Sequence, residues 1–281
     1  MKRKWIVSAD SGFDLTPDIK EKYDIRTQNI WVILGERSGK DCEFTQKELY
    51  DYADETGKLP QTGALSPTVY EETFRSFLEE AEKVVHVSIS SGISSCNQNA
   101  CIAAGELDGV YVIDSKNLSS GFGHLVYKLC ELLEGGMEVE DAVAAIEALA
   151  EKVDASFVLN TLEYMKKGGR CSTVAALGAN LLKLKPCIEV KDGKMGVCKK
   201  YRGNLKDVLQ QYVSERLADL ESIDNRRIFI THSGIDADIE KAIYDQVKAL
   251  DYFEEILITT ASSTIATHCG PNTLGVLFIK K

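Results

Sequence analysis

The stretch Val84-Val85-His86-Val87-Ser88-Ile89-Ser90-Ser91-Gly92-Ile93-Ser94-Ser95 changes character halfway along its length. Residues 84–89 form an apolar run typical of a β-strand, and the residues after it are mostly serines. A segment of small residues through Ala100 and Ala104 follows and is predicted to be helical. Strand, polar loop and helix in this order are typical of α/β proteins, in which polar loops at the carboxyl ends of strands carry function.

Two further transitions of this kind occur in the N-terminal part of the chain. Residues 5–7 read as a strand that ends in Ala9-Asp10-Ser11-Gly12. Residues 110–113 end in Asp114-Ser115 and lead through Ser119-Ser120-Gly121 into a helical segment. Because the carboxyl ends of parallel strands meet at one edge of a sheet, we expect the three polar loops to lie along the same edge.

Capping residues mark two helix starts between these strands. Thr45 and Glu48 have the spacing of a capping box, and Ser66-Pro67 supplies an N-cap followed by a proline at the first helical position. Strands that alternate with helices in this way predict an N-terminal parallel-sheet α/β domain, to which we assign residues 1–155.

The pattern changes after residue 155. Residues 186–190 and 195–201 read as two strands joined around Asp192-Gly193, which is a type I′ hairpin signal. Further strands and helices then alternate: strands at 156–159, 228–231, 256–259 and 274–279, and helices at 205–220 and 235–250. We therefore predict an α/β fold with a second, α+β domain over residues 156–281 and, in the absence of a Pro/Ser-rich linker, close packing of the two domains.

Composition excludes several classes of protein. The chain has 281 residues and a net charge of -10, and no basic run with interleaved aromatics suits a phosphate backbone, so nucleic acid is not an expected partner. Its eight cysteines show neither a C-x-x-C pair nor a zinc-like spacing and read as reduced thiols. No apolar run approaches the ~18 residues of a membrane span, and we expect a cytoplasmic protein.

The common nucleotide and hydrolase motifs are also missing from the sequence. There is no G-x-x-x-x-G-K-[ST] loop, no G-x-S-x-G elbow and no H-E-x-x-H helix, and Gly121-Phe122-Gly123 lacks the third glycine of a dinucleotide fingerprint. We therefore expect no cofactor, no metal and no self-contained catalytic machinery.

Hydroxyl side chains gather in four segments: Asp10-Ser11, Thr62 to Ser66, Ser88 to Ser95 and Asn117 to Ser120. One interpretation is that they cap helices and turns, which is the commonest role of such residues. Five serines in residues 88–95 exceed what one cap needs, and clustered neutral donors at helix N-termini favour an anion. The sequence therefore favours an anion site, with capping as the alternative.

A histidine and two arginines are further candidates. His268 lies between two apolar strands, and the neighbouring Gly270 and Pro271 predict a tight turn that exposes it, unlike His86 inside a strand. Arg170 and Arg202 each lie beside glycine, where a guanidinium can reach a carboxylate or phosphate, although a solvated loop arginine is the simpler interpretation.

Over its whole length the chain resembles the DegV family of bacterial fatty-acid-binding proteins, which includes the FakB subunits of fatty acid kinase. The motifs that carry the resemblance occur in the family's order: Asp10-Ser11, Thr62 to Ser66, Ser90 to Ser94, Ile113-Asp114-Ser115, Leu162 to Arg170, Lys185-Pro186, Tyr201-Arg202-Gly203 and His268-Cys269-Gly270-Pro271. The chain departs from the family at Ser94-Ser95-Cys96-Asn97, where Ser-Gly-Thr-Tyr is usual, and in the motif that begins at Thr62.

The resemblance implies that a long-chain fatty acid is enclosed between the two domains. It places the carboxylate on Thr62 and Ser94 with His268 nearby. It also places Arg170 and Arg202 near the mouth, facing a separate ATP-dependent kinase subunit that forms the acyl phosphate. Loops around the head group are then supported by four residues: Ser11, Ser91, Ser119 and Gly270. Transient contact with a membrane surface is a further expected interaction.

Two alternatives to a non-catalytic lipid carrier stay open at this stage. One is a hydrolase or transferase in which a serine of residues 88–95 is the nucleophile and His268 the base. The other is a regulatory sensor whose affinity for a protein partner changes when lipid binds.

Overall fold

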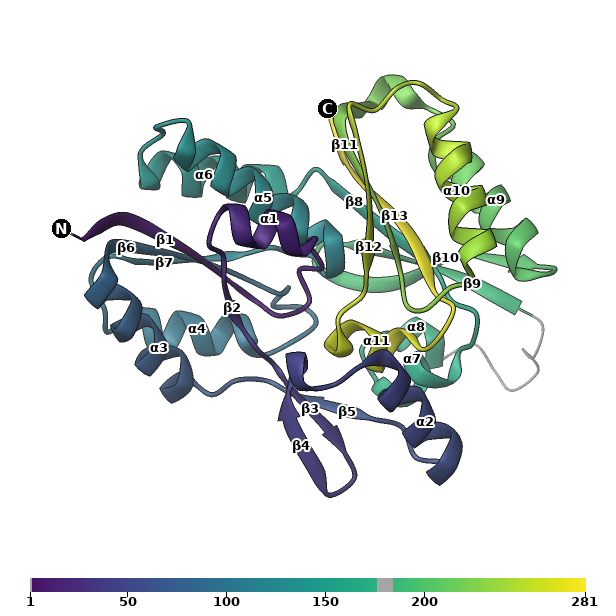
Figure 1. Cartoon of the computed structure of the whole chain (residues 1–281), viewed down its shortest axis with the longest axis horizontal. Helices are drawn as coiled ribbons and strands as arrows, with labels where there is room; N and C mark the ends of the chain where they lie inside the picture. Colours follow the sequence, from purple (N-terminus) through teal and green to yellow (C-terminus); the bar gives the residue numbers. More distant parts are fainter. Residues whose placement is uncertain (1, 176–183) are drawn as a thin grey trace.

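In the computed structural model, which describes residues 2–175 and 184–281, three β-sheets are covered by helices (Figure 1). The first sheet is parallel, with the strand order β2-β1-β6-β7. Its strands are β1 (Arg3–Asp10), β2 (Arg26–Gln28), β6 (Ala81–Ser88) and β7 (Val110–Asp114). The predicted strands at residues 5–7, 84–89 and 110–113 are thus confirmed, and their polar loops share one edge.

Helices cover both faces of this parallel sheet (Figure 1). One face carries α3 (Pro67–Glu80) and α4 (Cys96–Ala104); the other carries α1 (Pro17–Lys22), α5 (Ser119–Glu134) and α6 (Val139–Ala150). The N-cap prediction is confirmed at α3, where the Ser66 side chain accepts from the backbone N–H of Val69. The fold of this half is therefore the predicted parallel α/β arrangement.

The second sheet has six strands in the order β10-β9-β8-β13-β11-β12. The strands are β8 (Val153–Val158), β9 (Leu184–Lys191), β10 (Lys194–Arg202), β11 (Ile223–His232), β12 (Glu255–Thr260) and β13 (Leu274–Lys280). Neighbours are antiparallel except for β11 and β12. The predicted hairpin is present, and Asp192 and Gly193 have the positive φ angles, 49° and 74°, of a type I′ turn.

Two amphipathic helices, α9 (Leu205–Arg216) and α10 (Ala237–Lys248), pack on one face of the six-stranded sheet around a buried apolar cluster. The opposite face packs on α5, which also contacts β1 of the parallel sheet. A single apolar cluster consequently includes Phe122 of α5 together with Val7 and Leu277 from the two sheets. The two halves share a core, and the proposed division at residue 155, which lies inside β8, stays a prediction.

The third sheet is a small antiparallel one that the sequence patterns did not predict. It consists of β4 (Arg37–Lys40), β3 (Trp31–Leu34) and β5 (Gln61–Gly63) in that order. Two helical segments, η1 (Asp41–Glu43) and α2 (Gln46–Thr56), connect β4 to β5. The Thr45–Glu48 capping box predicted for α2 is confirmed.

This small sheet covers α11 (Ser263–Cys269), a helix from the other end of the chain. Val32, Leu49 and Ala266 belong to the apolar cluster between them. Three short segments complete the described elements: α7 (Glu163–Gly168), α8 (Ser172–Ala175) and η2 (Leu220–Ser222). Residues from both ends of the sequence are thereby brought to the same place.

Candidate ligand-binding site

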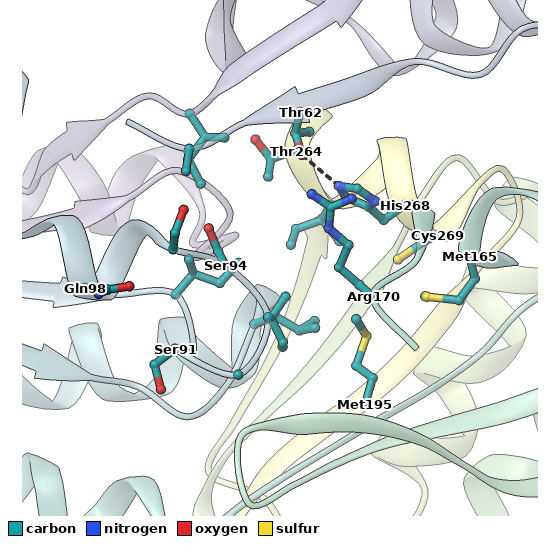
Figure 2. A pocket seen from close by; sticks show the side chains of 18 residues that line it. Thr62, Ser91, Ser94, Gln98, Met165, Arg170, Met195, Thr264, His268 and Cys269 are labelled. Carbon is teal, nitrogen blue, oxygen red and sulfur yellow. Dashed lines mark hydrogen bonds between the residues drawn. The ribbon is translucent and has the colours of Figure 1, made fainter. Parts of the chain in front are cut away.

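A cavity of about 530 Å³ lies between the two halves of the molecule (Figure 2). This volume is within the ~300–1,000 Å³ typical of small-molecule sites. One wall comes from β5 and the segment that joins β6 to α4; the other comes from the α7–α8 connection, β10 and α11. Its lining is Ile30, Thr62, Ala64, Ile89, Ser91, Gly92, Ile93, Ser94, Ser95, Gln98, Leu118, Met165, Arg170, Met195, Thr264, Ile265, His268 and Cys269.

The polar end of the cavity centres on His268 and Thr62. The Thr62 hydroxyl is hydrogen-bonded to His268 Nε2 at 2.8 Å, and Figure 2 shows the Arg170 side chain beside the imidazole. Burial, reinforced by the Arg170 charge, lowers the pKa of His268 to about 4, so the ring is neutral at pH 7. Among the described residues Nδ1 has no hydrogen-bond partner, which favours the tautomer with the proton on Nε2.

This tautomer determines what the Thr62 hydroxyl can do. A hydroxyl accepts two hydrogen bonds and donates one. If His268 Nε2–H donates to Thr62 Oγ1, the hydroxyl hydrogen of Thr62 is free to donate to a ligand. The pair therefore presents a donor to the cavity without bringing a second charge into it.

The serine-rich segment divides into structural and cavity-lining residues. Ser90 donates to the Gly193 carbonyl at 2.7 Å, and Ser88 accepts from Asn97 Nδ2 at 2.8 Å, so both have structural partners. Ser91 and Ser94 line the cavity, and Ser94 points into it (Figure 2). Ser94 Oγ accepts from the Cys96 N–H at 3.2 Å, which leaves its hydrogen available. The serines with structural partners, Ser88 and Ser90, are thus different from the serines that line the cavity.

The buried Asp10 side chain is hydrogen-bonded to the backbone at the start of this serine-rich segment. Its Oδ2 accepts the Ile89 N–H at 3.0 Å, and its other oxygen accepts from the Tyr70 hydroxyl and lies 3.3 Å from His86 Nε2. Ser8 is hydrogen-bonded to His86 Nδ1 at 2.9 Å. The side chains of Ser8, Asp10, Tyr70 and His86 are all buried. This group therefore positions the serine-rich segment and is not exposed to the cavity.

Four predicted site residues do not line the cavity. Ser11 and Ser119 lie behind it: Ser11 Oγ accepts the Ile30 N–H at 3.0 Å, and Ser119 donates to Asp14 at 2.6 Å. Gly270 ends α11 with a φ of 73°, and a Cβ there would clash with the Tyr164 ring. Arg202 is exposed at the end of β10.

The predicted environment of His268 was wrong. Residues 263–269 form helix α11 rather than an exposed turn, and His268 lies in its last turn with little exposure. The Ser262 side chain caps this helix, and Asp41 accepts from the N–H groups of Ser263 and Thr264 at 3.2 and 2.8 Å. The patterns missed α11 because seven residues are too few to show a helical period. They also missed Thr264 as a lining residue.

The apolar end of the cavity continues toward the shared core. A small apolar space of about 20 Å³ adjoins the cavity and shares Leu118, Ile265 and Cys269 with it. Beyond these three residues it is bounded by Phe157 and Leu277, among others. The site therefore has a hydrogen-bonding end and an apolar end that points between α5 and the six-stranded sheet.

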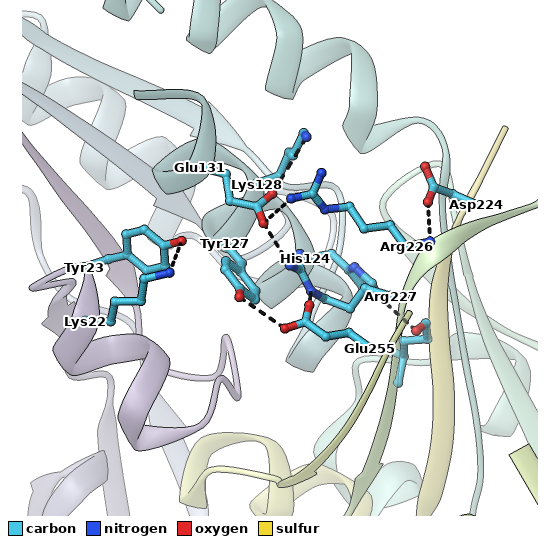
Figure 3. Close-up of polar contacts among 11 residues, drawn as sticks. Lys22, Tyr23, His124, Tyr127, Lys128, Glu131, Asp224, Arg226, Arg227 and Glu255 are labelled. Atoms are coloured by element: carbon cyan, nitrogen blue, oxygen red, sulfur yellow. Dashed lines mark hydrogen bonds and ion pairs between the residues drawn. The ribbon is translucent and has the colours of Figure 1, made fainter. Parts of the chain in front are cut away.

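The other end of α5 is tied to this sheet by a polar cluster (Figure 3). Arg227 donates to Glu131 of α5 at 2.9 Å and to Glu255 of β12 at 2.5 Å, and its guanidinium stacks 3.5 Å from the centre of the Tyr127 ring. Only 5% of the Arg227 side chain is exposed. These contacts hold the two halves together away from the cavity.

The geometry gives limited support to a serine hydrolase. The hydroxyl bonded to His268 belongs to Thr62, and in the described part of the chain no carboxylate is hydrogen-bonded to Nδ1. Within residues 2–175 and 184–281, no group of three or more His, Cys, Asp or Glu side chains could hold a metal ion. In the same residues no helix has the length and apolar character needed to cross a bilayer.

Fold and cavity define a two-part α/β protein whose cavity has hydrogen-bonding groups at one end and apolar side chains at the other. The family model described as "Uncharacterised protein, DegV family" matches residues 4–281. A DegV domain-containing protein from Clostridium perfringens is 30% identical over 98% of this chain and 98% of its own length. The chain belongs to the DegV family, which confirms the resemblance.

Two solved structures extend the comparison. A DegV family protein from Thermus thermophilus, described for its fatty acid binding, is 30% identical with a TM-score of 0.91, covering 99% of this chain and 100% of that one. A stearic acid-binding protein from Eubacterium ventriosum is 28% identical with a TM-score of 0.87, covering 99% and 98%. Both are similar to this chain along almost its full length.

Proposed function

We propose that this protein binds a long-chain fatty acid in the cavity between its two halves, with the carboxylate at Thr62, Ser94 and His268. The observation that carries the proposal is the shape of the site, a cavity of about 530 Å³ with donors at one end and an apolar extension at the other. The family relatives described as fatty-acid-binding and stearic acid-binding support the same ligand class.

The head group is held by neutral donors in this proposal. Thr62 and Ser94 each have a hydroxyl hydrogen to donate, and Arg170 lies at the same end as the only charged lining residue among those described. A carboxylate accepts such bonds readily, and hydrogen bonds to a charged group are worth about 1.5–3 kcal/mol each. Because Arg170 is exposed, water and salt screen its attraction for the carboxylate. Arg170 is therefore expected to contribute more to the approach of the ligand than to its affinity.

The acyl chain supplies most of the binding free energy. Each methylene removed from water contributes ~0.8 kcal/mol, so a long chain gains on the order of 10 kcal/mol before the cost of ordering both partners. In this proposal the acyl chain lies past Leu118 and Ile265 and extends toward the small apolar space near Phe157. Because that space holds only about 20 Å³, we expect a long tail to displace these side chains as it enters.

The bound acid is then presented to a separate ATP-dependent kinase subunit that converts it to an acyl phosphate. Arg170 and Arg202 are the proposed contacts, because both are exposed and neither is salt-bridged within the described residues. The protein itself acts as a carrier, and the nucleotide chemistry belongs to the partner. The kinase contact is tested separately by measuring the rate of phosphoryl transfer by such a kinase at increasing concentrations of wild-type or Arg202→Ala protein.

Native mass spectrometry of the purified protein, with analysis of extracted lipid, tests the ligand class. We expect an acyl ligand in one-to-one ratio that is displaced by added stearate. Thr62→Val protein should carry less of it, and Thr62→Ser should carry as much as wild type. Protein that holds no acyl ligand and takes up no stearate after delipidation would overturn the proposal.

A further inference from the structure

A pair of cysteines lies on the hairpin that forms one wall of the cavity. Cys187 is on β9 and Cys198 is on the neighbouring strand β10. The strand register is irregular at this point: Val197 pairs with Ile188, and Lys199 pairs with Cys187, so Cys198 is an extra residue in a β-bulge. In a bulge two residues oppose one, and here Cys198 and Lys199 both oppose Cys187.

The two thiols are close to each other but differ in exposure. Cys198 Sγ donates to the backbone carbonyl of Cys187 at 3.4 Å. Cys187 is buried at 1% exposure against the α9 core, whereas Cys198 is exposed to solvent. Opposed residues in antiparallel strands have Cα atoms about 4.5–5.5 Å apart, which is within the ~4.4–6.8 Å that a disulfide spans.

The two thiols also differ in the direction in which their pKa values are shifted. The hydrogen bond from Cys187 lowers the pKa of the Cys198 thiol, and the same contact together with burial raises the pKa of Cys187. Cys101, another exposed cysteine, has no thiol neighbour in the described structure, and burial raises its pKa. A thiolate is the form that attacks oxidants, so Cys198 is the expected entry point for oxidation.

We propose that Cys187 and Cys198 form a reversible oxidation site that closes to a disulfide when the protein meets hydrogen peroxide. The Cys198 thiolate attacks one peroxide oxygen, an S–O bond forms, the O–O bond breaks, and the released hydroxide takes up a proton as water. Cys187 sulfur then attacks Cys198 sulfur. The S–S bond forms, the S–O bond breaks, and hydroxide leaves as water with the Cys187 proton. Two thiols are oxidised and one peroxide is reduced to two waters.

The position of the pair connects it to the cavity wall. The chain between the two cysteines includes the turn glycine Gly193, whose carbonyl accepts from Ser90 of the serine-rich segment at 2.7 Å, and Met195, which lines the cavity. A Cβ on Gly92 would clash with the Gly193 carbonyl, so the turn and this segment are in close contact. The disulfide would therefore fix the base of the hairpin whose tip meets the proposed head-group site.

Peroxide titration of the full-length protein followed by alkylation and tryptic mass spectrometry tests the proposal. We expect a cross-linked pair of peptides, residues 184–191 with residues 195–199, that has lost two hydrogen atoms and is restored by a thiol reductant. Cys198→Ser, at an exposed position, and Cys187→Ala, which keeps an apolar core, should each abolish the cross-link. Cys101→Ser is the matched control and should leave it unchanged. Sulfinic or sulfonic acid at Cys198 with Cys187 still alkylatable would overturn the proposal, as would a cross-link that survives in Cys198→Ser protein.

Discussion

Replacing Thr62 with valine removes one hydroxyl from the head-group end of the cavity and keeps nearly the same volume. In the free protein that hydroxyl is hydrogen-bonded to His268 Nε2 at 2.8 Å, and His268 Nδ1 already lacks a partner among the described residues. The variant therefore leaves both ring nitrogens of a partly buried imidazole without a protein hydrogen-bond partner among the described residues. We expect two separate consequences, one for stability and one for binding.

The size of each consequence follows from the lost contacts. An unsatisfied buried polar group costs about 1–3 kcal/mol, so the free energy of unfolding of Thr62→Val should fall by roughly 2 kcal/mol. Loss of a hydrogen bond to a carboxylate costs about 1.5–3 kcal/mol, so the dissociation constant for a fatty acid should rise about 10–100-fold. Thr62→Ser keeps the hydroxyl and should bind within about threefold of wild type.

Urea unfolding and calorimetric titration of delipidated protein with stearate measure the two effects, with the titration performed far below the unfolding transition of both variants. The reasoning is refuted if Thr62→Val binds stearate as tightly as wild type. It is also refuted if Thr62→Ser is as weak as Thr62→Val, because the methyl group rather than the hydroxyl would then be responsible.

Three further predictions follow from other parts of the structure. Burial lowers the pKa of His124 from its usual 6.5 to about 4. Between pH 7 and pH 5 the unfolded protein therefore binds a proton at this residue and the folded protein does not, which favours unfolding. Over this range the free energy of unfolding, measured with urea, should fall by about 2 kcal/mol more in wild type than in His124→Phe. Glu131→Ala removes one of the two carboxylates that bind the buried Arg227 and should cost about 2 kcal/mol in the same assay, whereas Lys128→Ala should change stability by under ~0.5 kcal/mol; equal losses would contradict this assignment. Ala261→Val narrows the small apolar space and should weaken stearate about tenfold more than laurate, and equal weakening would place the tail elsewhere.

The sequence predicts the parallel sheet well because its signals are local. The strand over residues 84–89 and the hydroxyl-rich loop after it are neighbours in sequence, as are Thr45 and Glu48 of the capping box. The hairpin likewise depends on two adjacent residues, Asp192 and Gly193, with the positive φ that a type I′ turn needs. Each of these features is determined by residues that lie close together in the sequence.

The small antiparallel sheet and α11 depend on contacts between distant residues. β5 has three residues and pairs with Trp31, Val32 and Ile33 across the intervening α2, so no short-range pattern reveals it. The N-terminus of α11 is fixed by Asp41, more than two hundred residues earlier in the chain. That is why His268 could be selected from sequence while its helix, and its contact with Thr62, could not.

A crystal structure of the protein with stearate is the most direct test of the proposed ligand site. We expect continuous, elongated density between α5 and α11, with the carboxylate within hydrogen-bond distance of the Thr62 and Ser94 hydroxyls and the tail directed past Ile265 toward Phe157. Density for the acid on the outer surface, or a carboxylate placed away from Thr62 and Ser94, would contradict the proposal.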